Sequence, residues 1–307
     1  SPTSARVFIT HRLVFALAPL FLCKSSSFVL QSRTQRHIYP PKPSFSSSSV
    51  NSIGSRNHHR STIHPPVKMA SSTPSAFNPL AELNLPSPLI LGSASFTRKL
   101  ILKEMNIPFD VVVRSIDEKA LGDRNGDASD LVLQLAKAKN EHLTNCIMDG
   151  DVEDIDLDGK GVIVLTGDQV VTHGTTDSTT IMEKPESILE AKGFVAKYAV
   201  SPPSTVGAVV MTHLPSRISV CGVDTSTIRF RPSVANCDLI DRLLEDDAPV
   251  MGCAGGLMVE HPFVVEHIDG IDGSQDGVMG LSKDLVMRLL KEISVSLEDN
   301  RNSQGKS

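Results

Sequence analysis

Asp168 and Gln169 follow an apolar run of the chain, and this position could carry out acid–base chemistry. Residues 161–172 are the most strand-like stretch of the sequence, so we expect Asp168 at the end of a buried strand. A carboxylate there must pair with a cation, bind a metal or shift its pKa. Strand ends are also where open α/β sheets bind their ligands. The alternative is a loop aspartate that hydrogen-bonds its own backbone.

The segment Glu183-Lys184-Pro185 begins fifteen residues after Asp168. Pro185 can start a helix, which would place Lys184 just before that helix and near the end of the strand. A lysine beside Asp168 would keep the carboxylate ionised at neutral pH and able to accept a proton. Taken alone, a lysine in such a position is usually an exposed charge.

A candidate anion site lies at the start of the first expected helix. Ser93 and Ser95 precede that helix, where hydroxyl groups and free backbone N–H groups converge. Arg98 follows in the first turn and could pair with a phosphate through two hydrogen bonds. The other interpretation, which this segment alone favours, is that Ser95 only caps the helix and Arg98 is a solvated charge.

Two further segments bring charged groups to the ends of expected elements. Asp117 and Glu118 follow the second expected strand, and Lys139 lies one helix later; singly, each would be interpreted as a surface charge. The loop 253–260 contains two adjacent glycines, which allow close approach of its backbone to another group, and it ends at Glu260.

The acidic segment 149–158 imitates a calcium-binding loop. Six of its ten residues are acidic, but the twelfth position of such a loop requires Glu and is occupied by Leu165. The residues that follow also have the pattern of a strand instead of a helix. We therefore interpret this segment as a solvated insertion.

Alternating strands and helices position these residues. We expect, in order, a strand at 88–92, a helix through 98–105, a strand at 109–113, a helix capped by Asp127 or Ser129, the strand 161–172, a helix from Pro185 to about Tyr198, strands 205–214 and 217–230 joined at Pro215-Ser216, a helix at 237–245, an irregular segment 253–280, and a helix capped by Ser282 and running to Ile293. The helix after Asp127 would bury Leu131, Leu135, Ala138 and His142. This succession predicts an α/β fold with a twisted mixed sheet and flanking helices.

Composition divides the chain into three parts. Residues 1–81 contain no Asp or Glu but nine Lys and Arg, which is typical of an unfolded leader. Residues 82–300 are long enough for one α/β domain, and 301–307 are a polar tail that we expect to be disordered. The acidic balance of residues 82–307 argues against a nucleic-acid partner, and four scattered cysteines there favour buried thiols over disulfides.

The leader leaves two locations open. Met69 followed by Ala70-Ser71-Ser72 resembles an ordinary start, which would give a cytoplasmic protein; the alternative is that the Ser-rich basic leader directs the chain to a chloroplast or mitochondrion. The apolar run 13–22 is too short to span a membrane, so no membrane association is expected. Homodimer formation is left open.

The chain from Leu89 to about Ile293 resembles the Maf family of nucleotide pyrophosphatases. Seven pieces carry the resemblance in order: Leu91-Gly92-Ser93-Ala94-Ser95 with Arg98, Asp117-Glu118, Leu135-Ala136 with Lys139, Gly167-Asp168-Gln169, Glu183-Lys184-Pro185, Ala254-Gly255 with Glu260, and Gly280-Leu281. The resemblance implies two lobes around a nucleotide cleft and cleavage between the α- and β-phosphates. It also implies that Asp168 is the proton acceptor, that Ser93, Ser95, Arg98, Lys139 and Lys184 bind substrate, and that a divalent metal (Mg²⁺ or Mn²⁺) is needed, with Glu118 as a ligand.

Three positions, Thr97, Gln169 and Glu260, depart from the commonest family pattern and bear on base specificity. Gln169 and Glu260 together resemble the branch that acts on 7-methyl-GTP, and the carboxylate of Glu260 could accept hydrogen bonds from guanine. That branch carries a large aromatic residue where this chain has Thr97. Three other functions remain open: a dTTP/UTP pyrophosphatase, a nucleotide-binding cell-division regulator with little turnover, and a metal buffer that uses the acidic segment.

Overall fold

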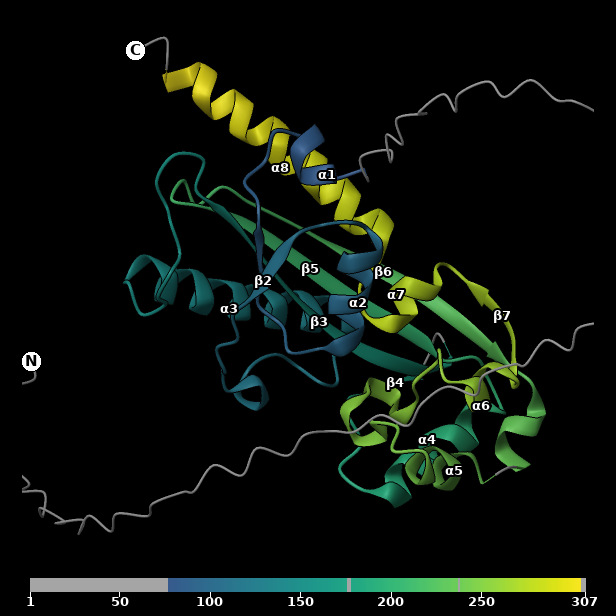
Figure 1. The fold of residues 1–307 in the computed structure, drawn as a ribbon. Coiled ribbons are helices and arrows are strands. Elements are labelled where there is room, and N and C mark those ends of the chain that lie inside the picture. The colour runs from purple at the N-terminus through teal and green to yellow at the C-terminus, as the bar shows by residue number, and fades with distance from the viewer. Residues whose placement is uncertain (1–76, 176–177, 237, 305–307) are drawn as a thin grey trace, which may run out of the picture. The chain divides into compact units, whose positions relative to one another are not determined.

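The computed structural model describes residues 77–175, 178–236 and 238–304 (Figure 1). Residues 1–76 and 305–307 lie outside the described residues, and with them lie nearly all of the expected leader and the end of the expected tail. The described helices and strands are α1 (Pro79–Glu82), β1 (Leu89–Leu91), α2 (Phe96–Glu104), β2 (Phe109–Val111), α3 (Ala128–Met148), β3 (Val162–Thr175), β4 (Ser178–Met182), α4 (Ile188–Tyr198), β5 (Ser204–Leu214), β6 (Ser219–Phe230), α5 (Leu239–Glu245), α6 (Pro262–Val265), β7 (Ile268–Asp272), α7 (Gln275–Met279) and α8 (Lys283–Gln304).

A seven-stranded mixed sheet forms the centre of the domain. Its order is β2-β1-β3-β5-β6-β7, with β4 paired to β3. The short strand β1 runs parallel to β2 and β3, whereas β3, β5, β6 and β7 pair antiparallel. The β5–β6 hairpin turns at Pro215-Ser216, as the sequence predicts. The predicted fold class, a mixed α/β sheet with flanking helices, is confirmed.

The two faces of the sheet are covered by different helices, and β3 alternates between them. Ile163 and Leu165 pack in a core with α2 and α8, whereas Val164 and Val170 pack on the other face with residues of α3. Figure 1 shows α8 and α3 on opposite sides of the long strands. Because side chains alternate along a strand, the even-numbered residues from Val162 to Val170 face α3, and the odd-numbered ones from Ile163 to Gln169 face α2, α7 and α8.

A second hydrophobic core lies beyond one end of the long strands. Figure 1 shows α4, α5 and α6 grouped there. The side chains that fill this core come from these helices, from Val171 and Met182, and from the connecting segments, and they include Phe194, Tyr198, Leu243 and Val264.

Several elements differ from the predictions. The helix α3 begins at its cap Asp127 but buries Val132, Ala136 and Leu143, whereas Ala138 is half-buried and His142 exposed, so the predicted face is partly wrong. The helix that we expect to start at Pro185 begins at Ile188, with Ser187 as its cap. The helix α8 continues past Ile293 to Gln304, so residues 301–304 of the expected tail are helical.

The segment 253–280, expected to be irregular, contains α6, β7 and α7. Its glycines hide these short elements from a periodicity analysis. None of the described helices is both long and apolar enough to cross a membrane.

Candidate active site

Asp168 lies in the middle of β3, where it pairs with Ala208 of β5, and not at a strand end as the sequence predicts. The reason is that β3 continues along β5 and β4 after its parallel partner has ended. The last β1 residue, Leu91, pairs with Leu165, so Asp168 lies three positions beyond the carboxyl end of β1. It therefore still lies past the ends of the parallel strands, which is the usual ligand site of an open α/β sheet.

Lys139 contacts Asp168 directly. Its Nζ lies 2.5 Å from Asp168 Oδ1 and 3.0 Å from Glu118 Oε1. Lys139 follows Ala136 by three residues and precedes Leu143 by four, so it shares the buried stripe of α3 and points at the even-numbered face of β3. The expectation that Lys184 is the cation beside Asp168 is wrong, because Lys139 occupies that position.

Burial is the largest influence on the pKa of Asp168. Asp168 is only 9% exposed, and its desolvation raises the pKa of the carboxyl group, while Lys139 and then Arg98 act to lower it and Glu118 adds to the rise. The expectation of a readily ionised aspartate therefore needs correction, because burial raises the pKa of Asp168 by more than the two cations lower it. A carboxylate with a raised pKa is a stronger base than an exposed one.

Arg98 is held inside the protein and is not a solvated charge. Its Nε donates to the carbonyl oxygen of Gly280 at 2.9 Å, and its Nη1 donates to Gly167 O at 2.8 Å and to Ser93 Oγ at 3.3 Å. Burial lowers the pKa of Arg98, and the charges of Asp168 and Glu118 raise it. Nη2 makes no hydrogen bond with the described residues, so this nitrogen remains available to a ligand.

Ser93, Ser95 and Thr97 form the turn into α2. Ser95 Oγ accepts the backbone N–H of Arg98 at 3.4 Å and lies 2.9 Å from the Thr97 hydroxyl, and Ser93 Oγ accepts the N–H of Ser95. Ser95 is thus the N-cap that the sequence predicts. The hydroxyl groups converge at this helix start, but they are partly satisfied by the chain itself.

The side chain of Gln169 is hydrogen-bonded to α7. Its side-chain Nε2 donates to Gly277 O at 3.1 Å and to Val278 O at 3.0 Å. Its Oε1 lies toward Gly280, the left-handed residue that ends α7. Gln169 can therefore offer a ligand only an acceptor oxygen.

Glu260 and Lys184 each lie within electrostatic reach of Cys253. The Oε1 atom of Glu260 is buried and has no hydrogen-bond partner among the described residues, and burial raises the pKa of its carboxyl group. Burial first, and then the negative charge of Glu260, raise the pKa of Cys253 to about 11, which the charge of Lys184 partly offsets. Lys184 is exposed and forms no ion pair with the described residues.

The structure brings the predicted residues into two groups. Lys139 contacts Asp168 and Glu118, and Arg98, which binds Ser93, acts on Asp168 through its charge. Lys184 and Glu260 form the second group, in which each acts on Cys253 through its charge. The sequence analysis missed Arg124 and gave Glu183 no role, although these two residues join the loops. Glu183 stands next to Lys184 in a quoted motif, whereas nothing in the local sequence distinguishes Arg124.

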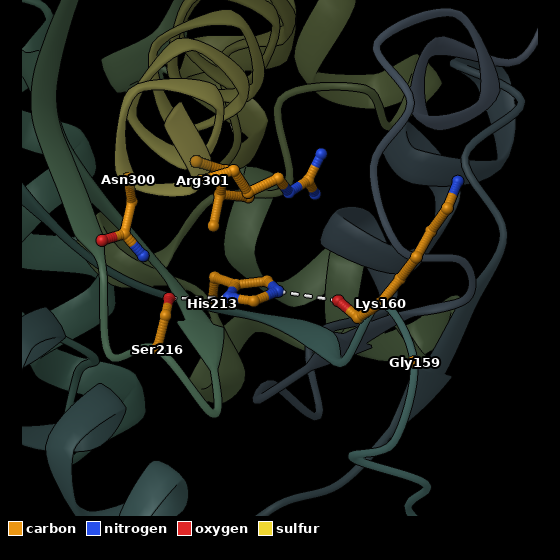
Figure 2. Close-up of a pocket in the computed structure, with 7 residues that line it drawn as sticks. Gly159, Lys160, His213, Ser216, Asn300 and Arg301 are labelled. Atoms are coloured by element: carbon orange, nitrogen blue, oxygen red, sulfur yellow. Dashed lines mark hydrogen bonds between the residues drawn. The ribbon is translucent and has the colours of Figure 1, made fainter. Parts of the chain in front are cut away.

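A hollow of about 340 Å³ lies at the other end of β3, away from this network. Figure 2 shows His213 in its wall, hydrogen-bonded to Ser216 and to the backbone oxygen of Lys160, with Asn300 and Arg301 of α8 above it. Six residues of strand separate Val162 from Asp168, or about 20 Å. This hollow is therefore separate from the candidate active site. Its acidic neighbour, the segment 149–158, has all six carboxylate residues exposed, as predicted for a solvated insertion.

Comparisons with known proteins agree with this geometry. The family described as Maf-like protein matches residues 88–293. A 7-methyl-GTP pyrophosphatase of Dictyostelium discoideum is 33% identical over 207 residues, which cover 67% of this chain and 98% of that protein.

Two bacterial proteins match more distantly. A nucleoside triphosphate pyrophosphatase of Chlamydia pneumoniae is 26% identical over 219 residues, covering 69% of this chain and 97% of the relative. A dTTP/UTP pyrophosphatase of Salinibacter ruber is 26% identical over 224 residues, covering 72% and 96%.

Proposed function

The chain belongs to the Maf-like protein family, and from this membership we propose that it hydrolyses a nucleoside triphosphate to the monophosphate and pyrophosphate. The observation that carries the proposal is the buried Asp168, held by Lys139 with Arg98 nearby. A purely binding protein has no need of a desolvated carboxylate whose pKa is raised, whereas a hydrolase needs a base of this kind.

In the proposed reaction Asp168 accepts a proton from water. The water oxygen forms a bond to phosphorus, the bond between the α- and β-phosphates breaks, and pyrophosphate leaves. Arg98 through its free Nη2, together with Lys139 and Lys184, would offset the charge of the phosphates. Fixed cations in a water-poor site are usually the largest contribution to such catalysis.

The residues at Lys139 fit a divalent metal of the magnesium or manganese type. Glu118 and Asp168 both reach Lys139 Nζ, so two carboxylates converge at one point. The described residues contain no cluster of three or more His, Cys, Asp or Glu that could hold an ion by itself, so substrate and water would have to supply the other ligands. Mg²⁺ is commonly held by one or two carboxylates plus substrate phosphates and water. Glu118 would be its main ligand, because its side chain is 46% exposed. A bound metal would polarise the phosphate oxygens and lower the pKa of the attacking water.

For the substrate we propose 7-methyl-GTP. Glu260 supports this choice, because a buried carboxylate oxygen without a donor is costly unless a ligand supplies one. The N1–H and amino group of guanine are such donors, and methylation at N7 adds positive charge that favours a nearby anion. The relative from Dictyostelium discoideum is named for this substrate. The alternative is dTTP or UTP, for which the relative from Salinibacter ruber is named.

A nucleotide screen with one variant tests the proposal. Pyrophosphate release would be measured for 7-methyl-GTP, dTTP and UTP with magnesium and with EDTA. Asp168→Asn should lower kcat by about 10²–10⁴ and still bind a non-hydrolysable nucleotide. Asp110→Asn, an exposed aspartate on β2, is the control and should match the unmodified protein. Retained turnover in Asp168→Asn would place the base elsewhere, and binding without turnover in the unmodified protein would favour the regulator.

A further inference from the structure

Arg124 joins two segments of the site that are far apart in sequence. Its Nε lies 3.3 Å from Glu183 Oε2, and its Nη2 lies 3.4 Å from Glu183 Oε1. The same Nη2 donates to the backbone oxygen of Glu118 at 2.8 Å, and Nη1 donates to the backbone oxygens of Leu121 and Gly122. One guanidinium group thus holds the short 3-10 turn η1 (Glu118–Ala120) and the carboxylate of Glu183 together.

Glu183 extends this connection to a third segment. Its backbone oxygen accepts the N–H of Gly255 at 3.0 Å, in the loop that ends at Glu260. Gly255 is fixed from its other side, because the Tyr198 hydroxyl donates to its carbonyl at 2.7 Å. Glu183 is also the direct neighbour of Lys184. The segments that carry Glu118, Lys184 and Glu260 therefore meet at one residue.

The connection reaches Asp168 through Glu118. Arg124 binds the backbone of Glu118, whose carboxylate lies 3.0 Å from Lys139 Nζ, and Lys139 in turn contacts Asp168. The Glu118 side chain is 46% exposed, so packing alone does not fix its position. The turn beneath it is capped by the Asp117 side chain, which accepts the N–H of Ala120, and it is tied to the rest of the site by the carbonyl contacts from Arg124.

We propose that Arg124 and Glu183 are positioning residues that form a clamp across the active-site loops, holding Glu118 and Lys184 in place for the triphosphate and its metal. The inference rests on the proposed function. Neither residue is assigned a contact with the reacting atoms. The Arg124 side chain is 26% exposed and that of Glu183 44%, so the pair contributes little to global stability. Displacement of a charged group by about 1 Å can nevertheless lower turnover about a hundredfold.

The chain offers a matched control in a second ion pair between the same two segments. Lys119 Nζ lies 2.8 Å from Glu186 Oε1, and the two side chains are 86% and 77% exposed. This pair makes no hydrogen bond from Lys119 to the backbone of η1. If an ion pair between these segments were all that mattered, removing Lys119 would lower turnover as much as removing Arg124.

The test compares Arg124→Ala, Arg124→Lys and Glu183→Gln with Lys119→Ala. Turnover of 7-methyl-GTP is measured against substrate and magnesium concentration, and amide hydrogen exchange is followed in residues 118–124. We expect Arg124→Ala to lower kcat about tenfold, to raise the magnesium concentration needed for half-maximal rate about tenfold, and to accelerate exchange in 118–124. The melting temperature should be nearly unchanged.

The other variants separate the clamp from a general structural role. Arg124→Lys should recover only part of the rate, because one ammonium cannot reach the carboxylate and three carbonyls together. Glu183→Gln should resemble Arg124→Ala, and the double variant should be no worse than Arg124→Ala. Lys119→Ala should match the unmodified protein in every readout.

Two outcomes would overturn the clamp: unchanged exchange in 118–124 of a folded Arg124→Ala protein, or equal effects of Arg124→Ala and Lys119→Ala. The exchange measurement needs no turnover. If the unmodified protein hydrolyses none of the nucleotides, the proposed function fails, while exchange still decides whether Arg124 holds the turn.

Discussion

Replacing Lys139 with methionine removes a cation that contacts both carboxylates of the site. Methionine keeps the length and the apolar stem of lysine, so the buried stripe of α3 is preserved. The groups that then act on Asp168 are Arg98, which lowers the pKa of the carboxyl group, and Glu118, which raises it. We expect the pKa of Asp168 to rise further, and the acid limb of the kcat profile to move to higher pH.

The size of the shift follows from the contact that is lost. A hydrogen bond to a charged group contributes about 1.5–3 kcal/mol, and about 1.36 kcal/mol corresponds to one pH unit. The two side chains are 16% and 12% exposed, so solvent screens the pair only weakly. The acid limb should therefore move upward by about 1–2 pH units.

The raised pKa of Asp168 also makes the stability of the folded protein depend on pH. Since the folded-state pKa of Asp168 is raised, its protonation favours folding. That contribution is present below the ordinary pKa of an aspartate and is lost as the pH rises through the raised pKa. In Lys139→Met this loss should extend to higher pH, so the melting-temperature deficit relative to the unmodified protein should grow as the pH rises through that window.

The assay is the pH dependence of kcat at saturating substrate, measured together with thermal unfolding. Lys137→Met is the matched control, because Lys137 is exposed on the same helix. An acid limb in Lys139→Met that coincides with that of the control, in a folded and active protein, would refute the assignment of this limb to Asp168.

Three further predictions concern other parts of the domain. Glu260→Gln should reduce the preference in kcat/KM for 7-methyl-GTP over dTTP by about 1.5–3 kcal/mol. The melting temperature should not fall, because the variant removes a carboxylate whose pKa burial raises. An unchanged preference would argue against Glu260 as the residue that recognises the base. Replacing the six carboxylates of 149–158 with amides should leave the magnesium dependence of turnover unchanged, because all six are exposed; a large rise in the magnesium requirement would contradict this. Gly167→Ala should lower the free energy of unfolding by about 1–3 kcal/mol, because its Cβ would lie 2.8 Å from Ala208 O and 3.6 Å from Arg98 Cζ. The control Gly207→Ala should be tolerated, because its Cβ would lie 3.8 Å from Asp168 O. Equal melting temperatures for the two variants would show that the strand moves to accommodate the methyl group.

Local features of the fold could be predicted because their physical causes are local. The cap Asp127 accepts N–H groups two and three residues away, and Ser95 accepts the N–H of Arg98, three residues away, at the start of α2. The hairpin of β5 and β6 follows from two Val-rich runs and one turn. Short elements such as β4, β7 and α7 escaped, since they contain too few residues to establish a period and they owe their pairing to strands elsewhere.

The partner of Asp168 could not be predicted from its neighbours in the sequence. It depends on the rotation of α3, and two overlapping stripes of that helix are apolar enough to be buried. Leu131 and Leu135 are buried as predicted, but the buried face continues through Val132, Ala136 and Leu143 instead of Ala138 and His142. Lys139 lies on that side of the helix and therefore meets Asp168.

The sequence by itself determined the order of the longer elements, the mixed sheet and most of the polar residues from which the site is built. Tertiary structure alone decided which of them meet. Arg98 donates to carbonyls 69 and 182 residues away, and Arg124 reaches a carboxylate 59 residues away. Such contacts depend on strand register and on the ends of packed helices, which no local pattern encodes. For this reason an arginine that its own segment presents as a solvated charge becomes a half-buried part of the site.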